Sequence, residues 1–125
     1  MSDFQTMDDF AVFVNDYLTP DQLSVQAYSY ASDQQELSLL LTIDDYEMMC
    51  RWHAVWTFSG LHQAFFQSVM DSDNSFSIDS DSLAMKARLR DQELLFKANG
   101  LEMVVVDLPE PLFRLADVSF NEGGK

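Results

Sequence analysis

The sequence has few of the residues that cross-link chains, bind metal ions or cradle phosphates. It contains one cysteine, two histidines and four glycines in 125 residues. Because the single cysteine, Cys50, cannot form a disulfide within the chain, the cysteine content favours a reducing compartment. Two histidines leave little scope for a histidine-based catalytic set or a zinc site, and so few glycines exclude a glycine-rich phosphate loop.

Basic residues are also scarce. Seven lysines and arginines stand against 21 acidic residues, which gives a formal net charge of −14 at pH 7. Nucleic acids and anionic membranes both attract positive protein surfaces, so this balance argues against either as a direct partner. No apolar run approaches the ~20 residues needed to span a bilayer, and the first residues lack the basic start and apolar run of a secretory signal. We therefore expect a cytoplasmic protein.

Apolar residues, by contrast, are plentiful. Hydrophobic residues make up 47% of the chain and aromatic residues 13%. A disordered chain has far fewer, because it cannot offset the loss of conformational entropy by burying apolar surface. The length suits one domain, and neither an internal repeat nor a linker divides the sequence. Residues 1–125 are therefore expected to fold as a single domain.

The charge is distributed unevenly along the chain. Residues 1–50 contain ten acidic residues and no lysine or arginine, whereas residues 83–100 carry four of the seven bases. A fold does not require such an acidic block, because like charges weaken the compact state through self-repulsion. The block therefore serves either solubility or the binding of a basic partner.

The N-terminal segment predicts an amphipathic helix. Apolar residues recur there at helical spacing, at Phe4, Met7, Ala11, Val14 and Leu18. Thr6 and Asp9 are spaced as the N-cap and N3 residues of a capping box, and Pro20 stops the helix. We expect the helix to cover a sheet, with Asp8 and Asp16 facing away from the apolar stripe.

The rest of the chain alternates apolar and polar residues, as half-buried antiparallel strands do. The alternation covers residues 23–28, 37–43, 46–58, 83–89, 92–98 and 101–107. On the strand 46–58, Cys50 and Trp52 fall on the apolar face and are expected in the core. Residues 61–70 fit a short helix slightly better than a strand, and residues 112–120 fit a short helix or a strap. The expected fold is α+β, with an N-terminal helix packed on a mostly antiparallel sheet and one or two further short helices.

Two pairs of residues are expected to form two-residue turns. Asp44-Asp45 would place Ile43 opposite Tyr46. Asn99-Gly100 is the strongest turn signal in the chain, because both residues tolerate positive φ, and it predicts a hairpin between residues 92–98 and 101–107.

Candidate metal and catalytic motifs are incomplete. The acidic stretch 71–82 has oxygen-bearing side chains at the alternate positions of a calcium loop, but Phe76 stands where that loop needs glycine and Ser82 where it needs glutamate. Cys50 and His53 have Cys-x-x-His spacing, yet on a strand they point to opposite faces. We therefore predict a protein that is not an enzyme, with no catalytic residue, cofactor or metal ion.

In size and charge the chain resembles immunity and anti-defence proteins. This resemblance implies an acidic inhibitor that occludes a basic surface on a toxin, nuclease or other nucleic-acid enzyme, since complementary charge steers association and can mimic phosphate. The candidate partner-binding residues are the acids expected to be exposed on the helix and around the first turn, namely Asp8, Asp16, Asp44, Asp45 and Glu47.

Two alternatives remain open. The expected order of helix, three strands, helix and further strands resembles small acidic type III secretion chaperones, which implies a chaperone for a secreted effector. A small-molecule-binding domain is the third possibility. A dimer with an exposed apolar groove would favour the chaperone, a monomer with an acidic patch the inhibitor, and a deep pocket with buried polar groups the small-molecule-binding domain.

Overall fold

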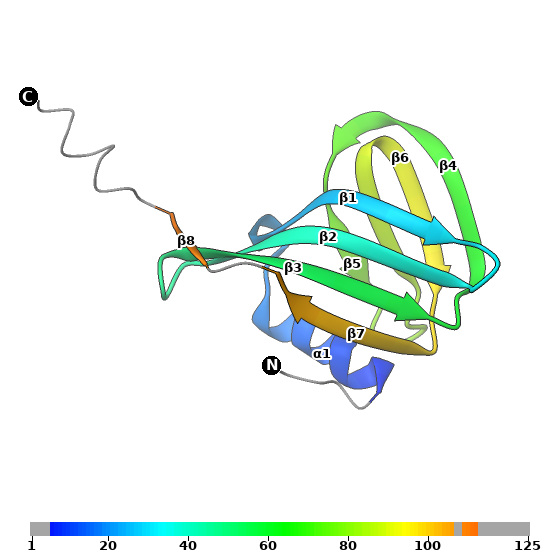
Figure 1. Ribbon diagram of the computed structural model, residues 1–125, viewed down its shortest axis with the longest axis horizontal. Coiled ribbons are helices and arrows are strands. Elements are labelled where there is room, and N and C mark those ends of the chain that lie inside the picture. Colours follow the sequence, from blue (N-terminus) through cyan, green and yellow to red (C-terminus); the bar gives the residue numbers. More distant parts are fainter. Residues whose placement is uncertain (1–5, 107–108, 113–125) are drawn as a thin grey trace, which may run out of the picture.

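The computed structural model describes residues 6–106 and 109–112. These residues form one α-helix, a single turn of 3₁₀-helix and eight strands (Figure 1). In chain order the elements are α1 (Met7–Tyr17), η1 (Pro20–Gln22), β1 (Leu23–Ala31), β2 (Glu36–Asp45), β3 (Cys50–Ser59), β4 (His62–Asp73), β5 (Phe76–Ile78), β6 (Met85–Lys97), β7 (Gly100–Val105) and β8 (Glu110–Pro111). No helix among these residues has the length and apolar character needed to cross a bilayer.

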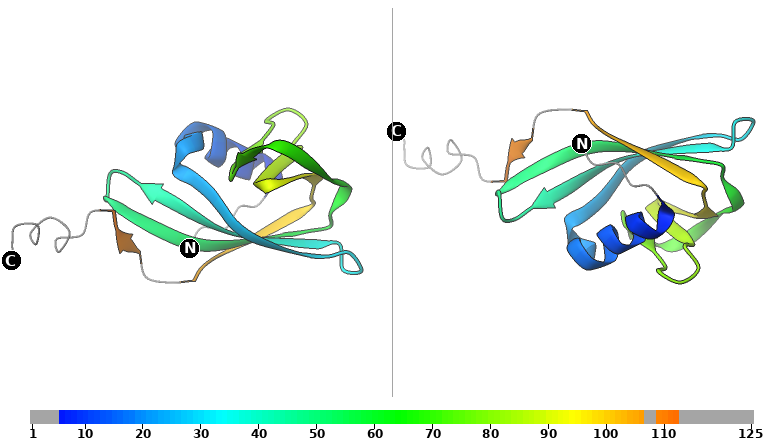
Figure 2. Two further views of the ribbon diagram at one scale, coloured as in Figure 1. Left: turned by 90° about the horizontal axis from the view of Figure 1, so that it is seen from above. Right: turned by 90° about the horizontal axis from the view of Figure 1, so that it is seen from below.

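The strands form two antiparallel sheets. In sheet A the order is β1-β2-β3-β7, and the short β8 pairs with the beginning of β3. In sheet B the order is β4-β6-β5. The helix α1 and sheet B lie on the same side of sheet A (Figure 2). The expected α+β class is present, but the strands are divided between two sheets.

The helix begins and ends where its sequence signals predict. The hydroxyl of Thr6 accepts a hydrogen bond from the backbone N–H of Asp9 (3.1 Å), which caps the first turn. The last helical residue is Tyr17, and the backbone of Leu18 is extended. The helix buries one face, made of Met7, Phe10, Ala11 and Val14.

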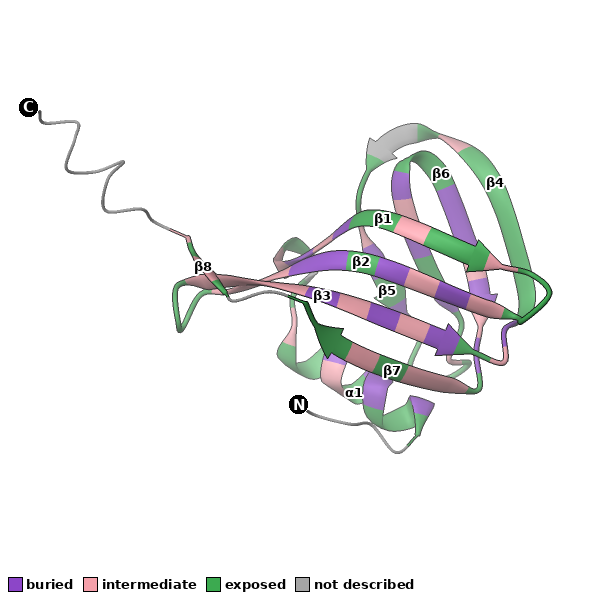
Figure 3. Ribbon diagram, in the orientation of Figure 1, coloured by how far each residue is buried: buried purple, intermediate pink, exposed green. Residues whose placement is uncertain are grey.

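The core is one continuous cluster built from α1 and both sheets. Alternate residues along the strands point into it, so buried and less buried positions follow one another (Figure 3). At its centre Phe10 meets Trp56 edge to face, with ring centroids 5.1 Å apart. The period-two pattern therefore predicted correctly which face of β2 and β3 is buried.

The predicted hairpin at Asn99-Gly100 is wrong. The strands before and after this pair lie in different sheets, because β6 pairs with β4 and β7 pairs with β3. Asn99 donates its backbone N–H to the carbonyl of Ser59 (2.9 Å), next to Gly60, where the chain also crosses from sheet A to sheet B. Two glycine-containing breaks thus form one corner between the sheets.

The expected helix at residues 61–70 is a strand. Residues 62–70 belong to β4, in which Phe66 lies opposite Leu94 of β6. Residues 83–89 and 92–98 do not form separate strands, since β6 runs through both and changes register near Arg90, whose φ is +59°. The described residues contain no α-helix besides α1, and the helix or strap expected at 112–120 lies outside them except for Leu112.

The turn predicted at Asp44-Asp45, which joins β2 and β3, lies further along the chain than predicted. Asp44 and Asp45 are the last residues of β2, and the turn comprises residues 46–49, so Ile43 lies opposite Trp52 rather than Tyr46. The shift is an even number of residues, so every side chain stays on its predicted face. The observed hairpin therefore differs from the predicted one only in which residues lie opposite each other.

Candidate functional site

The hairpin of β2 and β3 extends beyond the helix that covers it. An eleven-residue helix is about 16 Å long, whereas a ten-residue strand is about 33 Å long. Leu41 and Ala54 form the last fully buried pair of the hairpin, and the next pair toward the turn, Ile43 and Trp52, is only partly buried. The inner face of the hairpin is therefore left open past the end of α1.

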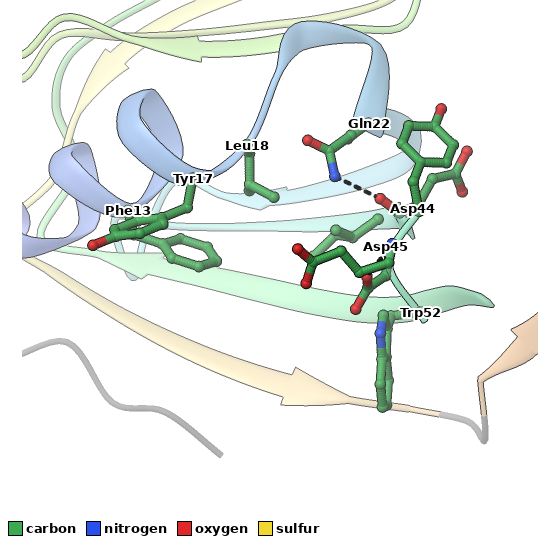
Figure 4. Close-up of a pocket in the computed structure, with 10 residues that line it drawn as sticks. Phe13, Tyr17, Leu18, Gln22, Asp44, Asp45 and Trp52 are labelled. Atoms are coloured by element: carbon green, nitrogen blue, oxygen red, sulfur yellow. Dashed lines mark hydrogen bonds between the residues drawn. The ribbon is translucent and has the colours of Figure 1, made fainter. Parts of the chain in front are cut away.

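A hollow of about 580 Å³ lies at this open end (Figure 4). We call it the hairpin hollow. Its lining residues are Phe13, Tyr17, Leu18, Gln22, Ile43, Asp44, Asp45, Tyr46, Glu47 and Trp52. The side chains from the end of α1 stand on one side, and those of β2, the turn and β3 on the other (Figure 4).

Four aromatic side chains line the hollow. Phe13 and Tyr17 come from α1, Tyr46 from the turn and Trp52 from β3. Tyr17 is 73% exposed and Tyr46 51% exposed, although soluble proteins usually bury such rings at least in part. The turn also exposes Met48 and Met49. Exposed aromatic and methionine side chains grouped in this way are typical of protein interfaces.

Asp44 lies at the hollow, but its negative charge is largely neutralised by an ion pair. Its carboxylate is paired in two places with Arg51, at 2.6 Å from Nε and 3.1 Å from Nη2, and this hydrogen bonding raises the pKa of Arg51. The carbonyl of Asp44 accepts a hydrogen bond from the side-chain amide of Gln22 (2.7 Å), which ties η1 to the hairpin. The prediction that Asp44 is exposed in a turn is wrong, because only 15% of its side chain is accessible.

Asp45 and Glu47 differ in role. One carboxylate oxygen of Asp45 accepts the backbone N–H groups of Glu47 and Met48, both at 3.1 Å, and so closes the turn. Asp45 is half-buried, whereas the side chain of Glu47 is exposed. The hollow therefore has one carboxylate fixed by the turn and one that is free to reach a partner.

The two helical candidates are separated. Asp16 is exposed in the last turn of α1 and precedes Tyr17, which lines the hollow, whereas Asp8 is exposed in the first turn, about 12 Å away at 1.5 Å per residue. Asp21 is a further exposed acid, which sequence reasoning did not select, and it precedes the lining residue Gln22 in η1. Three of the five predicted residues, Asp44, Asp45 and Glu47, thus line the hollow, Asp16 adjoins a lining residue in the sequence, and Asp8 lies apart.

The end of α1 adds to the negative potential. The C-terminus of a helix carries a partial negative charge from its unpaired carbonyl groups, and the last turn of α1 contains no basic residue to offset it. Three acids, Asp44, Asp45 and Glu47, line the hollow, and no base is among its described lining residues. Arg51 lies beside it, paired with Asp44. The other bases among the described residues all lie on β6.

The prediction that Cys50 and Trp52 are core residues is wrong. Both are on the expected face of β3 but lie toward the turn and are partly exposed, and Trp56 occupies the core instead. Sequence reasoning missed the aromatic side of the site for this reason. The available signal was Tyr46, Met48 and Met49 on either side of Glu47, since a turn normally carries polar residues.

No metal centre is assembled by the part of the chain that the structure describes. No group of three or more histidine, cysteine, aspartate or glutamate side chains is placed to hold an ion there. The former calcium-loop candidate includes β5, which buries Phe76 and Ile78. His53 instead lies 3.1 Å from a carboxylate oxygen of Glu110 on β8.

Comparison of the chain with protein-family models, curated proteins and solved structures found no match. The geometry of the hairpin hollow is therefore the basis for assigning a function.

Proposed function

We propose that this protein is a non-catalytic, acidic binding protein that neutralises a basic protein partner. In this function it acts as an immunity-type or anti-defence inhibitor of a toxin, nuclease or other nucleic-acid enzyme. One observation carries the proposal: four aromatic side chains and three acids, Asp44, Asp45 and Glu47, line the same open hollow.

The two kinds of side chain have complementary roles in such an interface. Large aromatic side chains supply most of the binding energy when a partner excludes water from them. The surrounding carboxylates accelerate encounter with a positive surface and disfavour acidic partners. An enzyme that binds nucleic acid presents a positive surface where phosphates dock, so an acidic protein seated there blocks its substrate.

The test is capture of the partner with matched charge-reversal variants. The site variant is Asp16→Lys/Glu47→Lys, because both side chains are exposed, Glu47 lines the hollow and Asp16 precedes the lining residue Tyr17. Asp44 and Asp45 are unsuitable, since reversing them would break the pair with Arg51 and the turn. The control is Asp33→Lys/Glu102→Lys, which changes the net charge equally at the other end of sheet A.

Immobilised wild-type protein and both variants are exposed to an extract of the native host, and the bound proteins are identified by mass spectrometry. We expect the wild type and the control to retain the same basic protein and the site variant to lose it. Retention by the site variant at the level of the control, or a partner that is acidic, would refute the proposal.

One further observation favours a chaperone for a secreted effector as the second candidate. Residues 52–70 contain no charged residue, and β4 exposes Phe65, Phe66 and Met70, of which Met70 is 99% exposed. Tyr30 of β1 contacts Phe66, with ring centroids 4.8 Å apart, and extends this apolar strip. The second helix on which the chaperone resemblance depended is absent at 61–70, where β4 runs instead. Sedimentation analysis separates the two candidates, because a dimer would favour the chaperone and a monomer the inhibitor.

A further inference from the structure

The hairpin hollow combines three features that favour a cation. Aromatic faces attract positive groups through their quadrupole, and tryptophan does so most strongly. Asp45 keeps one oxygen outside the hydrogen bonds that close the turn, and Glu47 is exposed beside it. The C-terminal carbonyl groups of α1 add partial negative charge on the opposite side.

The chain does not fill this position with its own nearby base. Arg51 belongs to β3, but its guanidinium is paired in two places with Asp44, and Arg51 does not line the hollow. Side chains at 51 and 52 point to opposite faces of the strand, so Trp52 faces the hollow while Arg51 faces away from it. None of the described residues that line the hollow is a base, so the hollow is open to a cation from another molecule.

Arginine suits the hollow better than lysine does. Its guanidinium is planar, weakly hydrated and able to stack on an aromatic face while its edge donates several hydrogen bonds to carboxylates. The ammonium group of lysine is compact and strongly hydrated, and it cannot use the two surfaces together in this way.

Resting on the proposed function, we infer that the hairpin hollow receives the side chain of one arginine from the basic protein partner. The aromatic side chains contact the face of the guanidinium, and the carboxylates of Asp45 and Glu47 accept hydrogen bonds from its edge. This arginine is the anchor of the interface, and the other acids steer the partner toward it.

The test uses a blocked Gly-Arg-Gly tripeptide as the probe. Two matched peptides carry citrulline, which has nearly the same shape without the charge, or lysine. Binding is followed by the indole N–H signals of the two tryptophans in nuclear magnetic resonance spectra. Trp52 lines the hollow, whereas Trp56 is fully buried in the core and serves as an internal control.

We expect the arginine peptide to shift the Trp52 signal in a saturable manner and to leave the Trp56 signal in place. The citrulline and lysine peptides are expected to bind at least tenfold more weakly. Glu47→Gln should weaken binding of the arginine peptide, while Asp33→Asn should not change it.

Equal binding of the citrulline peptide would overturn the inference, because the hollow would then take an uncharged group. Equal binding of the lysine peptide would overturn the assignment to arginine, and a Trp52 signal that never moves would overturn the site. The experiment needs no native partner, so its outcome is independent of the capture experiment. Arginine binding without a captured basic protein would refute the proposed function alone.

Discussion

The two tryptophans of β3 show how one face of a strand serves both the core and the site. Trp56 is completely buried and meets Phe10 and Phe76 edge to face, at 5.1 and 5.4 Å between ring centroids. Trp52, four residues earlier on the same face, lies past the end of α1 and lines the hollow. Their environments differ because the helix is shorter than the strands.

Truncation of Trp56 should therefore affect mainly stability, and truncation of Trp52 mainly binding. Trp56→Ala is expected to lower the free energy of unfolding by about 3–5 kcal/mol, as loss of a buried aromatic side chain does. Trp52→Ala is expected to lower it by about 1 kcal/mol and to abolish binding of the arginine peptide. Urea denaturation of both variants measures the two losses in free energy of unfolding. A larger loss of stability for Trp52→Ala than for Trp56→Ala would show that the core is wrongly placed.

Glu93 is a buried carboxylate held by a small polar network. It is 4% exposed and accepts hydrogen bonds from Gln67 at 2.6 Å and from Arg88 at 2.8 Å. The bond from Gln67, followed by the bond from Arg88, lowers the pKa of Glu93. The ionised form is therefore favoured more in the folded state than in the unfolded state.

This lowered pKa makes part of the stability depend on pH. The stabilisation is complete above the unfolded-state pKa of about 4.3 and is lost as pH falls through the lower folded-state pKa. The difference in free energy of unfolding between wild type and Glu93→Gln should therefore be large at pH 7 and small near pH 2. Urea denaturation at both pH values measures it. Glu102→Gln removes an exposed carboxylate without touching the network, and an equal effect of both variants at pH 7 would contradict this role for Glu93.

At the scale of elements, the corner between the sheets depends on Gly60. This residue has φ +64°, a left-handed conformation that favours glycine. A Cβ atom there would lie 2.7 Å from Nδ2 and 2.9 Å from Cβ of Asn99. At Gly100, in contrast, an added Cβ would meet the hydroxyl of Ser59 at 2.9 Å, and that side chain can rotate away.

Gly60→Ala is therefore expected to destabilise the protein by about 2 kcal/mol or more, from the left-handed backbone together with the overlap. Gly100→Ala should cost less than about 1 kcal/mol. Adding Asn99→Gly to Gly60→Ala should restore part of the loss by removing the overlap. Thermal unfolding ranks the three variants, and equal costs at the two glycines would mean that the corner is not formed as described.

The sequence predicted the type and face of most elements but not their connections. Local periodicity is set by burial on one face, which is why α1 and the buried faces of β2 and β3 were predictable. Asn99-Gly100 permits a sharp change of direction but does not decide whether the next strand returns to its neighbour or crosses to another sheet. In residues 61–70, the apolar residues at 61, 65 and 69 fit both a helix and one face of a strand. Pairing with β6 decides between them, and that is a long-range interaction.

At the scale of the whole molecule, acidic and aromatic side chains meet at the open end of the β2–β3 hairpin. Acids of the β2–β3 hairpin line the hollow, while the bases of the described residues other than Arg51 lie on β6 in the second sheet. The acidic half of the site was visible in the sequence as a block without bases. The aromatic half was not, because it exists only where a short helix leaves two long strands uncovered.

The central claim is that this acidic and aromatic end recognises a basic protein. The most direct measurement is the association rate with the captured partner across a salt series, for the wild type, Asp16→Lys/Glu47→Lys and Asp33→Lys/Glu102→Lys. The two variants change net charge equally, so a difference between them reports the place of the charge. We predict that the wild-type and control rates fall together as salt rises, because the Debye length is about 8 Å at physiological ionic strength, and that the site variant associates slowly with little salt dependence. A flat salt dependence for the wild type, or equal slowing in both variants, would contradict the account.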